Sequence, residues 1–313
     1  MTVPCNKRKR VIKPYVKTAL RYLTYNRTES SIGRDTSPCS AVPTVDMTES
    51  IDLSTDPNGA WEVLKGRLTV DIVEPLPVST PISEDKVRFV CVSDTHVKTD
   101  DMTHPMPDGD VLLHSGDFTF TGSLSEAENF NKWLGSLPYK HKIVIAGNHE
   151  VILDKDSCMK PRPAQEVITN ATYLQDSSTT VYGFKVYGAP WTPEYHVMAF
   201  NLTRGEPLRE KWRKIPEDVD VLMTHGPPLG HGDLTWRGDR AGCVDLMQTL
   251  QTRIKPKYHI YGHIHEGYGM TTNGRTIFVN ASTCDRFYDP VNAPLVFDLQ
   301  LPPGVHKSSA ELG

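Results

Sequence analysis

The sequence lacks the long apolar segments that cross or enter membranes. No run of about 18 apolar residues occurs in its 313 positions, which excludes a membrane-spanning helix. The longest apolar runs, such as those at 111–113 and 143–146, have only the length of strands. Nor does a charged stub followed by an apolar stretch open the chain, so we expect no secretory signal.

Cysteine is also scarce. The chain has six cysteines and no Cys-x-x-Cys pair. Cys91 falls in an apolar strand pattern, and Cys243 lies on the apolar face of a predicted helix. Thiols in such positions indicate a reduced, cytoplasmic protein rather than a fold held together by disulfides.

Acidic residues are missing from the start of the chain. Residues 1–28 hold eight lysines and arginines, whereas the rest has 26 basic and 38 acidic side chains, a net charge of −12. An acidic body argues against broad nucleic-acid binding. We predict that residues 1–50, basic and then rich in serine and threonine, form a disordered tail. A nuclear signal at Lys7–Arg10 and a mitochondrial transit peptide are the alternatives.

The rest of the chain has the length of one large domain. Residues 51–86 contain a strand-like stretch at 68–73 and then three prolines, which predicts an extended strap. We expect the domain to span 87–301 and a C-terminal tail to span 302–313.

Within the domain, short apolar strands alternate with amphipathic helices. The spacing of Ser125 and Glu128 predicts a capping box at the start of a helix over 125–135. A hairpin is predicted over 179–189, turning at Gly183. This alternation is typical of an α/β fold.

Five apolar strands end in Gly, Asp, Asn or His where the chain leaves the sheet. These exits are Asp94-Thr95-His96, Gly116-Asp117, Gly147-Asn148-His149-Glu150, His225-Gly226 and Gly262-His263-Ile264-His265. Ligands of α/β sheets bind beyond the carboxyl ends of strands, so we expect these residues to meet. Imidazole and carboxylate groups suit zinc, manganese or iron. The donors outnumber what one ion needs, and two-ion sites perform phosphoester chemistry.

The order D-x-H, G-D, G-N-H-E, H-G, G-H-x-H resembles that of the calcineurin-like metallophosphoesterase superfamily. The resemblance covers about Val87 to Leu301. Further segments are similar to the metallophosphoesterase-domain-containing subfamily. They are RFVCVSDTH at 88–96, DVLLHSGDF at 110–118, WLGSLPY at 133–139, YGAPWTP at 187–193, LMTHGPPLG at 222–230 and NASTC at 280–284.

The resemblance implies a four-layer sandwich: two mixed β-sheets flanked by helices, with a dimetal site at the sheet edges. It also implies two divalent transition-metal ions, with manganese favoured over iron or zinc. One ion would be held by Asp94, His96, Asp117 and His265, and the other by Asp117, Asn148, His225 and His263. His149 would be the catalytic imidazole that is not a ligand.

The implied activity is hydrolysis of a small phosphodiester, a cyclic nucleotide or a nucleotide-like compound, by a metal-bridging hydroxide. Two departures from related families bear on it. Protein phosphatases of the superfamily carry an Asp-Arg-Gly after the G-D motif, whereas Phe118-Thr119-Phe120 follows here. Some members of the subfamily have Gly at the first His of G-H-x-H and are weak enzymes, whereas this chain keeps His263. The alternatives are a low-activity regulator that binds metal and nucleotide, and a nuclease.

A lip around the site is expected from Trp191, His231, Trp236 and Arg240. Trp191 could stack on a nucleobase, or it could pack beneath the strap. His231 could contact substrate, or it could belong to an ordinary surface loop. The remaining histidines, at 104, 114, 141, 196, 259 and 306, fit no exit and are expected to be structural.

Overall fold

The computed structural model describes residues 53–157, 160–196 and 198–307. The predicted tail 1–50, with its two targeting alternatives, lies outside the described residues, as do residues 308–313. Within the described ranges, the helices are too short or too polar to traverse a bilayer.

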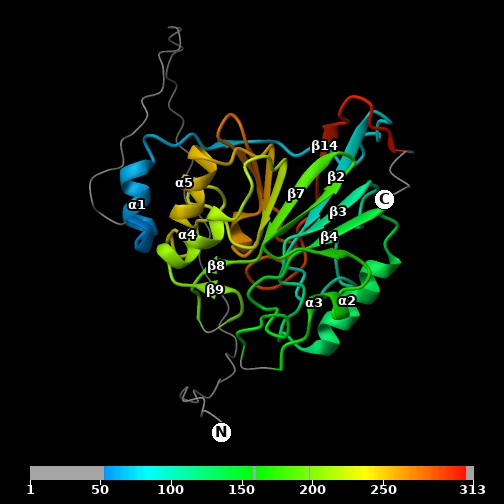
Figure 1. Ribbon diagram of the computed structural model, residues 1–313, viewed down its shortest axis with the longest axis horizontal. Coiled ribbons are helices and arrows are strands. Elements are labelled where there is room, and N and C mark those ends of the chain that lie inside the picture. The colour runs from blue at the N-terminus through cyan, green and yellow to red at the C-terminus, as the bar shows by residue number, and fades with distance from the viewer. Residues whose placement is uncertain (1–52, 158–159, 197, 308–313) are drawn as a thin grey trace, which may run out of the picture. The chain divides into compact units, whose positions relative to one another are not determined.

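Two mixed sheets form the centre of the domain (Figure 1). The five-stranded sheet has the order β14-β2-β3-β4-β5, formed by Leu295–Gln300, Lys86–Val92, Val111–His114, His141–Val144 and Thr172–Tyr173. The seven-stranded sheet has the order β1-β12-β13-β11-β10-β7-β6, formed by Asp71–Ile72, Gly269–Thr272, Ile277–Asn280, Tyr258–Tyr261, Val221–Thr224, Phe184–Ala189 and Ser177–Val181. Strands β8 (Thr192–Pro193) and β9 (Asn201–Leu202) pair separately.

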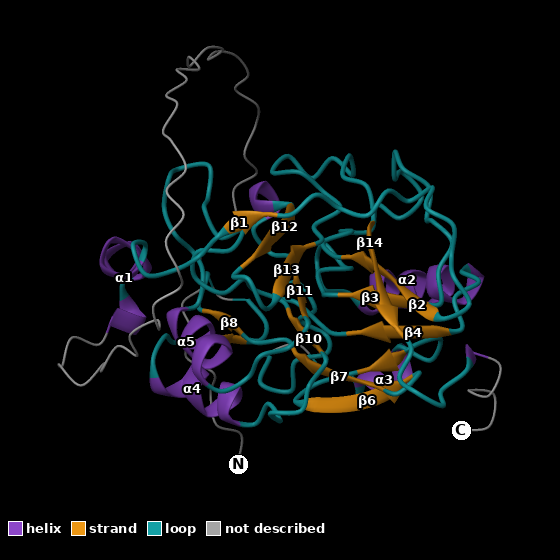
Figure 2. Cartoon of the chain, turned by 90° about the horizontal axis from the view of Figure 1, so that it is seen from above, coloured by secondary structure: helices purple, strands orange, loops and turns teal. Residues whose placement is uncertain are grey.

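Helices flank the sheets on both sides, as Figures 1 and 2 show. Helices α2 (Leu124–Ser136) and α3 (Ala164–Val167) lie on the side of the five-stranded sheet. Helices α1 (Pro57–Leu64), α4 (Glu206–Arg213) and α5 (Val244–Thr252) lie on the other side. Short 3-10 helices occur at Leu53–Thr55 and His265–Gly267. The four-layer sandwich that the sequence predicted is therefore confirmed.

Alternation along the strands builds two cores. In β2, Phe89 and Cys91 point between the sheets, where they meet Val221 and Ile260 of the seven-stranded sheet. The intervening residues of β2 point to the opposite face and join the core that includes α2. Because successive side chains of a strand alternate faces, one apolar run supplies both layers.

The capping box of α2 lies two residues earlier than predicted. Ser123 is the N-cap, and its hydroxyl accepts the N–H of Glu126, whose carboxylate accepts the N–H of Ser123. The predicted pair, Ser125 and Glu128, has the same spacing but lies inside the helix. Spacing alone could not distinguish the two registers, because both pairs fit the motif.

The extended strap predicted over 51–86 is wrong in part, because Pro57–Leu64 is helical. Asp56 caps this helix by accepting the N–H of Gly59 at 2.9 Å, and Pro57 occupies the first turn, where its missing N–H costs nothing. Ala60 is buried with Leu229, in the loop before α5, and with Val244 of α5. This packing stabilises α1.

Candidate metal centre

The five predicted exits converge at one edge of the sandwich. Strands β2, β3 and β4 run parallel in one sheet, and β10 and β11 run parallel in the other. All seven predicted ligands follow the carboxyl ends of these strands. Six of them fall into two groups whose donor atoms lie within 4.8 Å of one another: Asp94, His96 and His265; and Asp117, His225 and His263.

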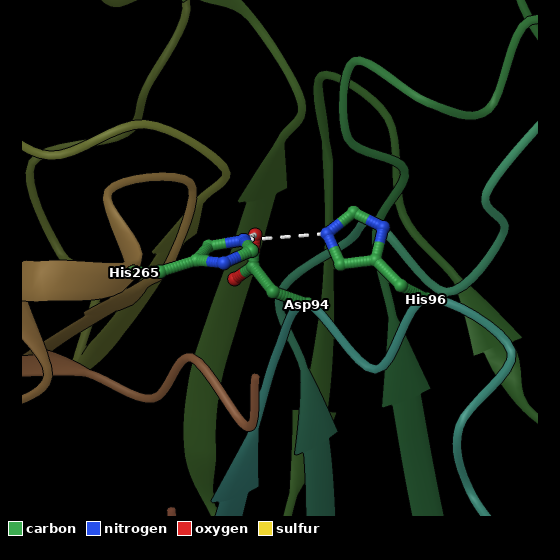
Figure 3. A group of neighbouring side chains, drawn as sticks. All are labelled: Asp94, His96 and His265. Carbon is green, nitrogen blue, oxygen red and sulfur yellow. Dashed lines mark hydrogen bonds and ion pairs between the residues drawn. The ribbon is translucent and has the colours of Figure 1, made fainter. Parts of the chain in front are cut away.

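The first ligand group consists of Asp94, His96 and His265 (Figure 3). The two imidazoles approach from opposite sides of Asp94, and their Nε2 atoms are 3.3 Å apart. His265 Nε2 also lies 3.3 Å from Asp94 Oδ1. Ser282 fixes the carboxylate by donating its hydroxyl to Asp94 Oδ2 at 3.0 Å.

The second ligand group consists of Asp117, His225 and His263, with Asn148 beside it. His225 Nε2 lies 3.2 Å from Asp117 Oδ2 and 2.9 Å from Asn148 Oδ1. Asp117 Oδ2 is also 3.9 Å from His96 Nε2 of the first group. Asp117 therefore stands between the groups, where a bridging carboxylate would be needed.

Backbone carbonyls fix the tautomers of three of the histidines that are predicted to be ligands. The Nδ1 atoms of His96, His225 and His265 lie 3.1, 2.8 and 2.7 Å from the carbonyl oxygens of Thr119, Ser115 and Asp285. A carbonyl only accepts, so each Nδ1 donates and each Nε2 faces the site as a possible ligand. This second layer of hydrogen bonds is what metal-binding histidines require. Together with two buried carboxylates, the donor set fits two divalent transition-metal ions.

His149 is oriented in the same way. Its Nδ1 donates to the carbonyl of Phe120 at 2.7 Å, and its Nε2 lies 3.9 Å from Asp117 Oδ2. This Nε2 is also within ligand reach of His96 and Asp117. The structure thus places His149 at the centre, and its role as a proton donor rather than a ligand stays a prediction.

Glu150 holds the loops after β3 and β4 together, a role that was not predicted from the sequence. Its buried carboxylate accepts the N–H groups of Gly147, Asp117 and Thr119 at 2.5, 2.8 and 2.9 Å. Burial and then the charge of Asp117 raise the pKa of Glu150 to about 7. The Glu of the G-N-H-E motif therefore ties the exit of β3 to the exit of β4.

Two glycines are required by close approach rather than by turns alone. A Cβ at Gly262 would collide with the carboxylate of Asp94, and a Cβ at Gly147 would collide with Asp117. The predicted ligands themselves carry backbone strain: Asp94, His96 and Asp117 have φ values of 50°, 40° and 53°. Such left-handed conformations cost on the order of 1–3 kcal/mol each and cluster at functional sites.

Each group pairs one histidine whose pKa is raised with one whose pKa is lowered. Burial alone would lower the pKa of His225, but the charge of Asp117 raises it to about 9. Asp94 likewise outweighs the burial of His265 and raises its pKa to about 9. In contrast, burial lowers the pKa of His96 to about 4 and that of His263 to about 3. Protonated His225 and His265 thus balance the carboxylates when no cation does.

The centre lies at the bottom of a cavity of about 520 Å³, a size typical of small-ligand sites. Aromatic side chains line it, namely Tyr195, Trp236 and Tyr288, and Trp236 is 63% exposed. Arg237 and Arg286 also line the cavity, and their guanidinium groups lie 5.0 and 5.8 Å from the Trp236 ring.

The structure does not place Trp191, His231 or Arg240 in the cavity lining. Trp191 is buried, donates its indole N–H to Asp176 at 2.6 Å, and packs beneath Lys211 rather than beneath the strap. His231 is buried and stacks on Phe278 at 3.7 Å, so it does not lie in a surface loop. The partners that bury these two side chains come from distant segments, so they left no local signal in the sequence.

Arg240 and His196 are also placed differently from expectation. The guanidinium of Arg240 donates to Asp233 at 2.6 Å and lies 3.9 Å over the Trp61 ring, in the packing between α1 and the 233–241 loop. His196, expected to be structural, lines the cavity beside Tyr195. Trp236 alone of the predicted lip does line the cavity.

Comparison with known proteins agrees with this geometry. The family model for the calcineurin-like phosphoesterases matches residues 87–267. This match covers more than half of the chain, and the chain therefore belongs to the calcineurin-like phosphoesterase family. Its members are metallophosphoesterases, which accords with the two ligand groups at the sheet edges.

Individual relatives narrow the similarity to one subfamily. The human and mouse proteins named Metallophosphoesterase domain-containing protein 1 are each 50% identical over 255 residues, covering 74% of this chain and 77% of theirs. The Caenorhabditis elegans protein named UPF0046 protein C25E10.12 is 47% identical over 274 residues, covering 82% of this chain and 96% of its own. The subfamily resemblance stated from sequence motifs is therefore confirmed.

Proposed function

We propose that the protein is a phosphodiesterase that uses two divalent ions to hydrolyse a small phosphodiester of the cyclic-nucleotide or nucleotide-like class. The observation that carries this proposal is the position of Asp117 between two complete ligand groups at the floor of an open cavity. Two divalent ions held there would activate a water molecule and neutralise phosphate oxygens.

The chain's own residues hold and orient the reacting groups. Carbonyl-fixed histidines and the hydrogen bonds of Glu150 preorganise the ligands, so little rearrangement accompanies the reaction. His149 Nε2 would donate a proton to the leaving oxygen as the P–O bond breaks, and water supplies the new P–O bond. Such a donor contributes roughly 10²–10⁴-fold in rate.

The surroundings of Asp117 support a diester over a protein phosphomonoester. In the 118–120 segment after the G-D motif, Phe118 is buried in the core, and Phe120 is 47% exposed beside His149. This segment contains no arginine that could bind a phosphate dianion. Arg204, which lines the cavity, already donates to the carbonyls of Gly242 and Ala241 at 2.7 and 2.8 Å.

The aromatic lining supports a substrate with a flat ring. Tyr195 and Trp236 present exposed rings, and base–aromatic stacking contributes about 1–3 kcal/mol per base. We propose manganese as the native ion, since imidazole and carboxylate donors accommodate it.

The test is an activity screen of manganese-reconstituted protein over cyclic nucleotides, linear diesters and phosphomonoesters. We expect kcat/KM to be highest for a small diester. Preference for monoesters would contradict the proposal, and binding of nucleotides without turnover would favour a regulator. Salt-sensitive binding and cleavage of single-stranded DNA would favour a nuclease.

A further inference from the structure

Tyr288 holds an unusual backbone conformation at the wall of the cavity. Its φ of 65° lies in the left-handed region, which bulky residues seldom adopt. Such a conformation persists only where the surroundings fix it, and it is concentrated at functional sites. The side chain lines the cavity and remains 38% exposed.

A compact loop over 285–289 fixes this conformation. Asp285 Oδ1 accepts the N–H groups of Phe287 and Asp289 at 2.8 and 3.0 Å, and the Tyr288 N–H donates to the Asp285 carbonyl at 2.9 Å. The same carbonyl accepts Nδ1–H of His265 at 2.7 Å. One loop therefore orients a metal-ligand histidine and places an aromatic ring beside it.

The ring of Tyr288 lies against the first ligand group. Its centroid is 4.8 Å from that of His96 and 5.3 Å from that of His265, both in edge-on contact. Phe120, from the loop after β3, packs edge-on against the same ring at 5.3 Å. A group attached directly to a phosphate at the centre would therefore meet this ring.

We propose that Tyr288 is a specificity-determining residue that contacts an unsaturated ring attached close to the phosphate. The proposal rests on the proposed function, because it assumes that phosphate occupies the metal centre. It narrows the substrate class to phosphoesters with one ester group that is flat and apolar next to phosphorus. A diester carries two ester groups, and this preference concerns only the one that lies against Tyr288, so a nucleoside at the other is compatible with it. Edge-on and offset pairs of rings are favourable beyond the area that they bury.

The test uses two probes that differ only in the ring, phenylphosphonate and methylphosphonate. Their P–C bonds withstand this hydrolytic chemistry, so calorimetry on manganese-loaded protein can measure dissociation constants. We expect the wild type to prefer the phenyl probe by about tenfold. Tyr288→Asn removes the ring while keeping a residue that tolerates φ near 65°, and it should abolish most of this preference. Tyr288→Phe should retain it.

Two further variants keep the result specific. Phe287→Ala removes a neighbouring ring that is 66% exposed and does not line the cavity, so it should keep the preference. Phe120→Ala, in a different loop, should reduce the preference partly by releasing Tyr288. Metal content and melting temperature establish that each variant is folded and loaded.

The proposal is overturned if Tyr288→Asn and Phe120→Ala keep the tenfold preference, or if only Tyr195→Ala removes it. It is also overturned if the wild type binds both probes equally. These outcomes are separate from failure of the proposed function. A protein that binds the phenyl probe selectively but hydrolyses no phosphodiester would retain the role of Tyr288 and lose the phosphodiesterase assignment.

Discussion

The two ligand groups of the metal centre differ in how firmly the fold holds them. In the first group, both histidine rings are fixed by backbone carbonyls, and the carboxylate of Asp94 accepts hydrogen bonds from Ser282 and from the N–H of His263. In the second, His225 is fixed in this way, but the ring of His263 makes no hydrogen bond to another described residue. A second ion would therefore depend on one loosely held ligand, His263.

The largest effect should come from the residue shared by both groups. Asp117→Ala removes the carboxylate between them, so the protein should lose both ions and on the order of 10³-fold or more in activity. Metal analysis and an aryl phosphodiester assay measure this. Asp239→Ala, a carboxylate at the cavity wall outside both groups, is the matched control. If Asp117→Ala retained both ions, Asp117 would not be the carboxylate that the two ions share.

Next in size is the loss of His149, which separates chemistry from metal binding. His149→Ala should keep both ions and lose about 10²-fold or more in kcat, because the leaving oxygen lacks its proton donor. The exposed His104→Ala serves as a control. If His149→Ala instead loses an ion, its Nε2 is a ligand, as its distance to Asp117 would permit.

The variants His263→Gly and His265→Gly each remove one histidine, from the second and the first group respectively, and so test the difference between the groups directly. His265 is tied to Asp94 and Asp285, so its loss should disorganise the first group as well as remove a donor. His263→Gly should leave the first ion in place and raise the Mn(II) concentration for half-maximal activity by about 10–100-fold. Excess Mn(II) should then recover part of the rate. Curves that superimpose on wild type would show that His263 does not touch the second ion.

The smallest expected effect is the release of protons when metal binds. In the metal-free chain the pKa values of His225 and His265 are raised to about 9, so both rings are protonated at pH 7. Metal binding must displace these protons; binding should therefore tighten as pH rises toward 9 and release about two protons at pH 7. Calorimetry in buffers of different ionisation enthalpy measures the release. Binding that is independent of pH between 6 and 9 would contradict the protonation described here.

Local sequence patterns predicted much of this structure. Strand exits ending in Asp, Asn or His predicted that residues distant in sequence would meet at one sheet edge, and the family resemblance implied which seven of them would bind metal. The apolar runs before Asp94 and His225 correspond to β2 and β10. Pairing beyond the sequence neighbourhood was not predictable. Trp191 is buried because Phe200 and Lys211 pack on it, and Tyr288 joins the centre only because the 285–289 loop returns to His265.

Helix α4 leaves only a weak local signal in the sequence. Leu208 and Trp212 are four residues apart and both buried, and Pro207 lies in the first turn, but only eight residues are helical. Two apolar positions in so short a segment are less than the periodicity that normally identifies a helix. Packing of α4 against α5, rather than local preference, stabilises it.

The central claim is that hydrolysis needs two ions, held by groups that share Asp117. The most direct measurement strips the protein of metal, verifies the loss, and follows hydrolysis of bis(4-nitrophenyl) phosphate during titration with Mn(II). We predict no activity in the metal-free protein, little after the first equivalent, and recovery as the second equivalent binds. Full activity in protein that is verified to be metal-free, or after a single equivalent, would contradict the account.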